Sequence, residues 1–143
     1  MPTHDEKKIL PFTPEQMFDL VADVARYPEF LPWCVATRVR ETDKTHLSAD
    51  MVIGFKMFRE QYTSTVTLKK PLQIDVAYQH GPFKYLENRW IFEPHGQGHC
   101  ALDFHVDFEF RSAMMEKVIG KVFTEATRRM VQAFEDRAAE LYG

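Results

Sequence analysis

The segment from Ser112 to Tyr142 has apolar residues at helical spacing and contains no proline, so it predicts one long amphipathic helix capped by the Ser112 hydroxyl. The apolar positions are Met115, Ile119, Val122, Phe123, Ala126, Met130, Phe134, Ala138 and Leu141. At about 1.5 Å per residue the helix would be roughly 45 Å long, and its other face is too charged to cross a bilayer. Such a helix needs an apolar surface along its whole length, which the rest of the chain must supply.

The chain of 143 residues has the size of one domain, expected over 1–143, and its net charge is only -3. This charge creates no field that would attract nucleic acid, so we expect no DNA binding. Aromatic residues make up 13% of the chain, which favours a roomy aromatic interior or an exposed apolar patch. Cys34 and Cys100 lack a redox or metal spacing, and no secretory signal is visible. We therefore expect a soluble, cytoplasmic protein that contacts a membrane only peripherally. The lack of an Arg/Ser-rich, mitochondrial-type presequence favours a bacterial-type protein, for which that membrane would be the inner membrane.

The first thirty residues predict a strand and two short helices. Thr3 to Leu10 is expected to be an edge strand, and Pro14 to Val24 a helix. Thr13 as N-cap with Gln16 three residues later is close to a capping box. A second short helix is expected to join the first at Ala25 to Tyr27.

Beyond Val35 the apolar pattern changes to a period of two, which predicts six further strands. The expected strands are Ala36–Glu41, Leu47–Ile53, Glu60–Lys69, Ile74–Tyr78, Leu86–Phe92 and Leu102–Phe110, with a break at Gly54 to Met57. Short connections between successive strands favour antiparallel pairing. The strands have one apolar face, which another element must cover. The result is an α+β arrangement in which a seven-stranded antiparallel sheet curves around the long C-terminal helix.

The sequence contains no catalytic constellation: nucleophile-elbow, P-loop, dinucleotide-binding and zinc-protease motifs are all missing. Three acidic residues alternate with apolar ones and are expected to face water: Asp103, Asp107 and Glu109. His95, His99 and Cys100 flank a glycine-rich turn without a second ligand cluster, so we expect no metal site. We therefore expect no enzyme activity and no cofactor.

Three aromatic-rich stretches resemble a known family. They are DVARYPEFLPWC (Asp23 to Cys34), FREQYTSTVTL (Phe58 to Leu68) and GPFKYLENRW (Gly81 to Trp90). In this order, within a likeness that runs from Lys8 to Leu141, they resemble the START-type, polyketide cyclase-like proteins. The resemblance implies a helix-grip (Bet v 1-like) fold with an apolar cavity between the sheet and the long helix.

The family has two branches that imply different functions. Coenzyme Q-binding members imply non-enzymatic binding of a polyisoprenoid quinone, ubiquinone, by a carrier or chaperone that supports respiration. Members like the bacterial toxin RatA imply binding to the large ribosomal subunit and inhibition of subunit association. The motifs do not separate these branches, and we favour ubiquinone as the ligand. A cyclase-like enzyme ranks last, because Glu60, Ser64 and Asn88 are the only polar candidates on the inward parity.

Every second residue of a strand lies on the same face of the sheet, and this alternation predicts which residues would contact the ligand. From the sheet these are Tyr62, Val66, Val76, Tyr78, Trp90, Phe92, Phe104, Val106 and Phe108. From the long helix they are Ile119, Val122, Phe123, Ala126, Met130 and Phe134. Phe30, Leu31 and Trp33 are expected to form a lid or a membrane-touching mouth, and Ile119 to Met130 is expected to be the part of the helix at the cavity.

Overall fold

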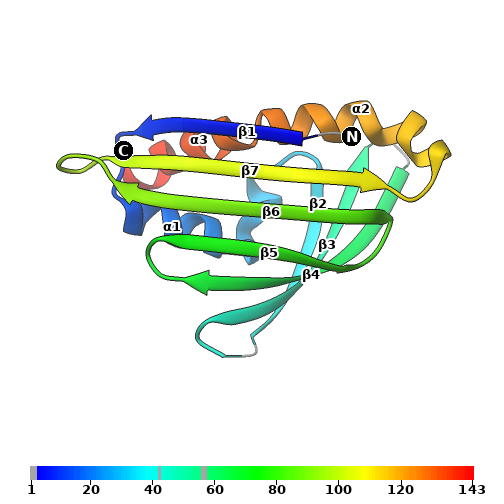
Figure 1. Ribbon diagram of the computed structural model, residues 1–143, viewed down its shortest axis with the longest axis horizontal. Helices are drawn as coiled ribbons and strands as arrows, with labels where there is room; N and C mark the ends of the chain where they lie inside the picture. The colour runs from blue at the N-terminus through cyan, green and yellow to red at the C-terminus, as the bar shows by residue number, and fades with distance from the viewer. Residues whose placement is uncertain (1–2, 42, 56–57) are drawn as a thin grey trace.

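The computed structural model describes residues 3–41, 43–55 and 58–143, which form a seven-stranded antiparallel sheet with the helices on one side of it (Figure 1). The strands are β1 (Thr3–Leu10), β2 (Cys34–Glu41), β3 (His46–Phe55), β4 (Phe58–Lys69), β5 (Gln73–His80), β6 (Phe83–Pro94) and β7 (Cys100–Phe110). Their order across the sheet is β1-β7-β6-β5-β4-β3-β2. β2 to β7 are therefore successive antiparallel neighbours, and β1 is an edge strand beside β7.

The predicted strands are all present, with small shifts at their ends. The expected break at Gly54 to Met57 is wrong at its start, because Gly54 and Phe55 belong to β3, while Lys56 and Met57 lie outside the described residues. Two bulges interrupt the strand pairing: Gln79 of β5 is the extra residue in the β4–β5 pair, and Lys84 of β6 is the extra residue in the β6–β7 pair. Bulges increase local twist, and β2 and β3 run steeply across the direction of β6 and β7 in Figure 1.

The two short helices follow β1 as expected, but their junction is not where the sequence placed it. Thr13 and Gln16 form a complete capping box at the start of α1 (Pro14–Ala22). A 3₁₀ helix, η1 (Val24–Glu29), follows at once, so the residues expected to join the helices lie inside η1. The reason is that Asp23 leaves helical geometry one residue early and its carbonyl accepts the Arg26 amide, which closes a tighter i→i+3 turn.

The single long C-terminal helix was a wrong expectation, because the helix is broken at Arg129. α2 (Ala113–Arg128) begins with the predicted Ser112 cap, and α3 (Met130–Tyr142) follows the break. Inside α2 the Thr127 hydroxyl donates to the Thr124 carbonyl at 2.8 Å, a bond that bends helices. The Arg129 amide then donates a hydrogen bond that is shared between the carbonyls of Glu125 and Ala126.

The buried face of α3 differs in part from the predicted one. Its fully buried face is Val131, Phe134 and Ala138, whereas Leu141, predicted to be apolar and inward, is 53% exposed. Val131 was not among the predicted apolar positions, whereas Met130, which was, is only partly buried. None of the helices in the described part of the chain is long and apolar enough to span a bilayer.

Candidate ligand-binding site

An interior cavity of about 70 Å³ lies between the sheet and the α2–α3 junction. This is room for roughly five water molecules, or one small ring. Ten of the predicted ligand-contacting residues line it: Trp33, Tyr62, Val66, Val76, Trp90, Phe104, Val106, Phe123, Met130 and Phe134. The cavity is much smaller than the roomy interior expected from the aromatic content, because aromatic side chains fill most of that space.

Five predicted residues line neither the cavity nor the groove described below. Phe92, Phe108 and Ile119 have the expected inward orientation but are buried in the packed core. The Tyr78 hydroxyl accepts the Phe83 amide at 3.0 Å and its ring packs on Phe83. Phe30, expected in a lid, instead packs inward edge to face on Phe134, with ring centroids 5.0 Å apart. Parity gives the face on which a side chain lies, but not whether it meets free space.

Several cavity residues were missed by the sequence analysis. Val21, Val24 and Tyr27 come from the first two helices, and Ala49, Met51, Ile74, Leu86 and Thr127 complete the set. The strand residues among them carried a usable signal, since they alternate with polar neighbours in the predicted strands. Thr127 carried none, because a threonine on a helix gives no apolar signal.

A second, larger hollow lies on the outside of the C-terminal helices. This outer groove has a volume of about 840 Å³. It runs from the loop that precedes β2, at Leu31 to Trp33, along the α2–α3 junction. Its apolar part includes the predicted residues Leu31, Val122 and Ala126, and its rim carries Lys121, Glu125, Arg129 and Asp136. The structure therefore separates the predicted ligand-contacting residues into an inner and an outer group.

Trp33 lines both the cavity and the outer groove. Its indole meets Phe123 edge to face. The loop that carries it is held by the Gly54 amide, which donates to the Trp33 carbonyl at 2.9 Å, and by the Cys34 amide, which donates to Leu31. The Trp33 side chain is thus a partition between two hollows.

The cavity wall contains no Asp, Glu, His, Lys or Arg among its described lining residues. The Tyr27 hydroxyl donates to the Val21 carbonyl, and the Tyr62 hydroxyl donates to the sulfur of Met51 at 3.2 Å. Burial raises the pKa of both tyrosines, so both stay neutral. The wall is therefore an uncharged surface.

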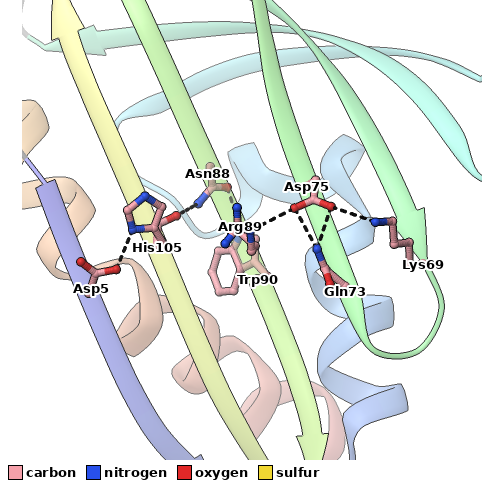
Figure 2. A network of polar contacts seen from close by, with 8 residues as sticks. All are labelled: Asp5, Lys69, Gln73, Asp75, Asn88, Arg89, Trp90 and His105. Carbon is pink, nitrogen blue, oxygen red and sulfur yellow. Dashed lines mark hydrogen bonds and ion pairs between the residues drawn. The ribbon is translucent and has the colours of Figure 1, made fainter.

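Asn88, one of the three polar candidates, holds the Trp90 indole in place (Figure 2). Its Nδ2 donates to the His105 carbonyl at 3.0 Å, and its Oδ1 accepts the Trp90 Nε1–H at 2.9 Å. Asp75 pairs with Arg89 on the opposite face of the same strands, so these charges lie away from the cavity.

Ser64, the second polar candidate, lines the cavity and is 3% exposed. Its hydroxyl has no hydrogen-bond partner in the part of the chain that the structure describes. Glu60, the third candidate, lies outside the cavity lining. Within the same described residues no cluster of three or more His, Cys, Asp or Glu could hold a metal ion.

A seven-stranded antiparallel sheet curved over C-terminal helices, with an apolar cavity between them, defines a helix-grip protein of the START and Bet v 1 type. A profile of the polyketide cyclase/dehydrase and lipid transport family matches residues 10–135, and the chain belongs to this family. The family expected from the three aromatic-rich stretches is thereby confirmed.

Two relatives show how the family divides. The chain is 41% identical over 138 residues to the ribosome association toxin RatA of Rickettsia prowazekii, covering 94% of each chain. It is 37% identical over 144 residues to the mitochondrial coenzyme Q-binding protein COQ10 homolog B of Xenopus laevis, covering 98% of this chain and 59% of the relative.

Two solved structures share the fold at low identity. A START superfamily protein from Mycobacterium smegmatis aligns with a TM-score of 0.78 and 18% identity, covering 97% of this chain and 98% of that one. The Zhui aromatase/cyclase of a Streptomyces species aligns with a TM-score of 0.79 and 14% identity, covering 96% and 93%. At these identities the likeness shows the fold alone.

Proposed function

We propose that this protein binds a polyisoprenoid quinone such as ubiquinone without chemical conversion, as a carrier or chaperone that supports respiratory electron transport. The observation that carries the proposal is the pair of hollows on either side of Trp33. One is small and lined by uncharged residues, and the other is larger and partly apolar. A quinone has the same two parts, a compact ring and a long hydrocarbon tail.

The volumes of the two hollows support placing the ring in the cavity and the tail in the groove. The inner cavity has room for about one ring and cannot hold an isoprenoid tail, since ligand pockets for larger molecules occupy roughly 300–1,000 Å³. The outer groove falls within that range. A quinone bound with its ring inside and its tail along Val122 and Ala126 requires the Trp33 side chain to move aside. Each methylene buried in the groove contributes about 0.8 kcal/mol, offset by the cost of association.

Two further observations support binding over catalysis. The described wall of the cavity lacks the acid–base pair that cyclisation chemistry needs. A relative at 37% identity is named as a coenzyme Q-binding protein. Because quinones reside in bilayers, a carrier of this kind would contact the membrane peripherally.

The test uses the two tryptophans, Trp33 and Trp90, both of which line the cavity. Adding short-tail ubiquinone to the purified protein should quench their fluorescence saturably, with one quinone per chain. Solvent extraction of protein purified from a quinone-producing host should release quinone. Finding no quinone in the extract and no saturable quenching would refute the proposal.

A variant pair tests the groove as the site of the tail. Ala126→Phe fills the groove and should weaken binding of long-tail ubiquinone more than binding of a short-tail analogue. Ala139→Phe adds the same bulk at an exposed position of α3 outside the groove and should change neither affinity.

The alternative function, a RatA-like toxin that binds the large ribosomal subunit and inhibits subunit association, has a separate observation in its favour. The relatives named RatA include one at 41% identity that covers nearly the whole of both chains. The outer face of α2 also exposes Lys117, Lys121 and Arg128, which could contact ribosomal RNA. Co-sedimentation with isolated large subunits, together with a block of subunit joining, would support this alternative. A quinone carrier should show neither.

A further inference from the structure

We infer that the Ser64 hydroxyl is the polar subsite of the cavity, where it hydrogen-bonds an oxygen on the ring of the ligand. This inference rests on the proposed function, and it specifies the chemical group that the cavity recognises. Ser64 points into the cavity from β4, and its hydroxyl has no partner in the described part of the protein. Buried hydroxyls are nearly always hydrogen-bonded, so one left open in a cavity wall indicates a ligand atom.

The other polar groups of the wall are already engaged. Asn88 bonds to the His105 carbonyl and to the Trp90 indole. Tyr27, Tyr62 and Thr127 each donate to a protein atom. Ser64 differs from these four residues in that its hydroxyl is fully buried and has no partner among the described residues, so its hydrogen bond remains for a ligand.

The local structure leaves space in front of this hydroxyl. Across the β3–β4 pair Ser64 lies opposite Ala49, whose small side chain also lines the cavity. On its other side Ser64 lies opposite Tyr78 of β5, next to a bulge at Gln79 of β5. Thr63 is held on the opposite face by Asp50, to which its hydroxyl donates at 2.7 Å. Side chains alternate along β4, so Ser64 faces inward together with Tyr62 and Val66, while Thr63 between them faces outward.

The chemistry of the subsite limits the class of ligand. With no charged side chain in the described wall, the partner of Ser64 must be a neutral oxygen, because an ion would remain unpaired. A serine hydroxyl both donates and accepts hydrogen bonds. It can donate to the carbonyl of a quinone and accept from the hydroxyl of the reduced quinol. One residue can therefore hold both redox forms, as a carrier of this cofactor requires.

The test compares Ser64→Ala with Ser48→Ala, the same change on the outward face of the neighbouring strand. Each protein is titrated with short-tail ubiquinone, with its quinol, and with an isoprenoid hydrocarbon that has no oxygen. Ser64→Ala should lower the affinity for quinone and quinol by roughly three- to tenfold, the effect of one hydrogen bond, and leave hydrocarbon binding unchanged. Ser48→Ala should change none of the three.

The outcomes separate this inference from the proposed function. If wild type binds quinone and Ser64→Ala binds it equally well, the subsite is wrong while quinone binding stands. If Ser64→Ala weakens quinone and hydrocarbon equally, Ser64 acts through cavity shape and the subsite is also wrong. If wild type binds no quinone, both are refuted. Urea unfolding provides a second measurement, because removing an unpartnered hydroxyl should not lower the midpoint, whereas removing a hydroxyl with a protein partner should.

Discussion

Trp33 and Phe123 meet edge to face at the boundary between the cavity and the outer groove, with ring centroids 6.0 Å apart and planes at 72°. Phe123 is fixed, because its ring also packs against Phe83, Phe108 and Phe110. Trp33 lies on a loop and is only partly buried. Of the two rings, Trp33 is the one that can turn aside to join the hollows.

Replacing Trp33 by Ala should therefore speed the exchange of bound quinone. The substitution removes an aromatic pair contact of about 0.5–1.5 kcal/mol, so dissociation should accelerate several-fold, up to roughly tenfold. Stopped-flow recovery of Trp90 fluorescence after dilution of the complex measures this rate. Trp33→Phe, which keeps an aromatic ring at the partition, should dissociate at nearly the wild-type rate. Equal rates for wild type and the Ala variant would show that the ligand takes another route.

Gly81 is expected to be intolerant of any side chain. Its φ of +148° is a conformation that favours glycine, and a Cβ there would lie 2.5 Å from the Cβ of Tyr62. Gly81→Ala should lower the free energy of unfolding by about 2–4 kcal/mol, measured by urea denaturation. Gly98, with a φ of +76° and open space around it, is the matched control and should lose only about 1 kcal/mol. Equal losses at both positions would show that the contact with Tyr62 has no effect.

Asp50 should make the free energy of unfolding depend on pH in the acidic range. Hydrogen bonds from Arg40, at 2.6 and 3.0 Å, and from Thr63 hold the pKa of the Asp50 carboxyl well below its usual range. A carboxyl whose folded pKa is depressed stabilises the protein fully above its unfolded pKa of about 4, and this stabilisation is lost as pH falls toward the folded pKa. Asp50→Asn should therefore cost roughly 1 kcal/mol at pH 7 and progressively less below pH 4.

A double-mutant cycle checks the cause of that pH dependence. Arg40→Gln alone should remove much of the same stability, and adding it to Asp50→Asn should cost little more. Unfolding free energies at pH 7 and pH 3 for the four proteins give the coupling. Additive losses would mean that the Arg40 pairing is not what depresses the Asp50 pKa.

The two buried thiols should be protected from alkylation in the folded protein. Burial raises the pKa of Cys34 to about 12 and that of Cys100 to about 11, so almost no thiolate is present at pH 8. Both should react with iodoacetamide slowly when folded and rapidly in denaturant. Single Cys→Ala variants assign each rate by mass spectrometry. Fast labelling of native Cys34 would show that the loop around Trp33 opens readily.

Amide hydrogen exchange should distinguish α2 from α3. The Phe134 ring of α3 packs against Tyr27, Phe30 and Trp90, and the Arg137 guanidinium pairs with Glu29. The start of α2 instead exposes Met114 and Val118, at 73% and 51%. We expect the amides of the first half of α2 to exchange faster than those at the centre of α3. Equal protection would mean that the break at Arg129 does not separate the two helices energetically.

The sequence predicted the sheet well because its signals are local. Alternation along Leu102–Phe110 determines which side chains of β7 face inward, and the capping box at Thr13 marks the start of α1. The break at Arg129 could not be predicted in this way. It contains no proline or glycine, and its cause is a hydroxyl of Thr127 that bonds to its own helix.

For the candidate site, the sequence could predict which side chains face inward but not which of them line the cavity. Phe92 and Phe104 both face inward from the sheet, but only Phe104 meets the cavity. Which of two inward rings meets free space depends on how all the rings of the core pack together. The outer groove depends likewise on the distance between the loop at Trp33 and the helix at Val122, which are far apart in the chain.

The helix break has a consequence for how such a protein can diverge. Changes at Val131 and Ala138 of α3 are expected to act mainly on the amount of folded protein, because both lie in the core and outside the two hollows. Changes in α2 at Val122 and Ala126 would act on the shape of the groove without removing those contacts. Selection could therefore alter what the protein binds through the groove-facing positions of the C-terminal helices while their core-facing positions preserve the fold.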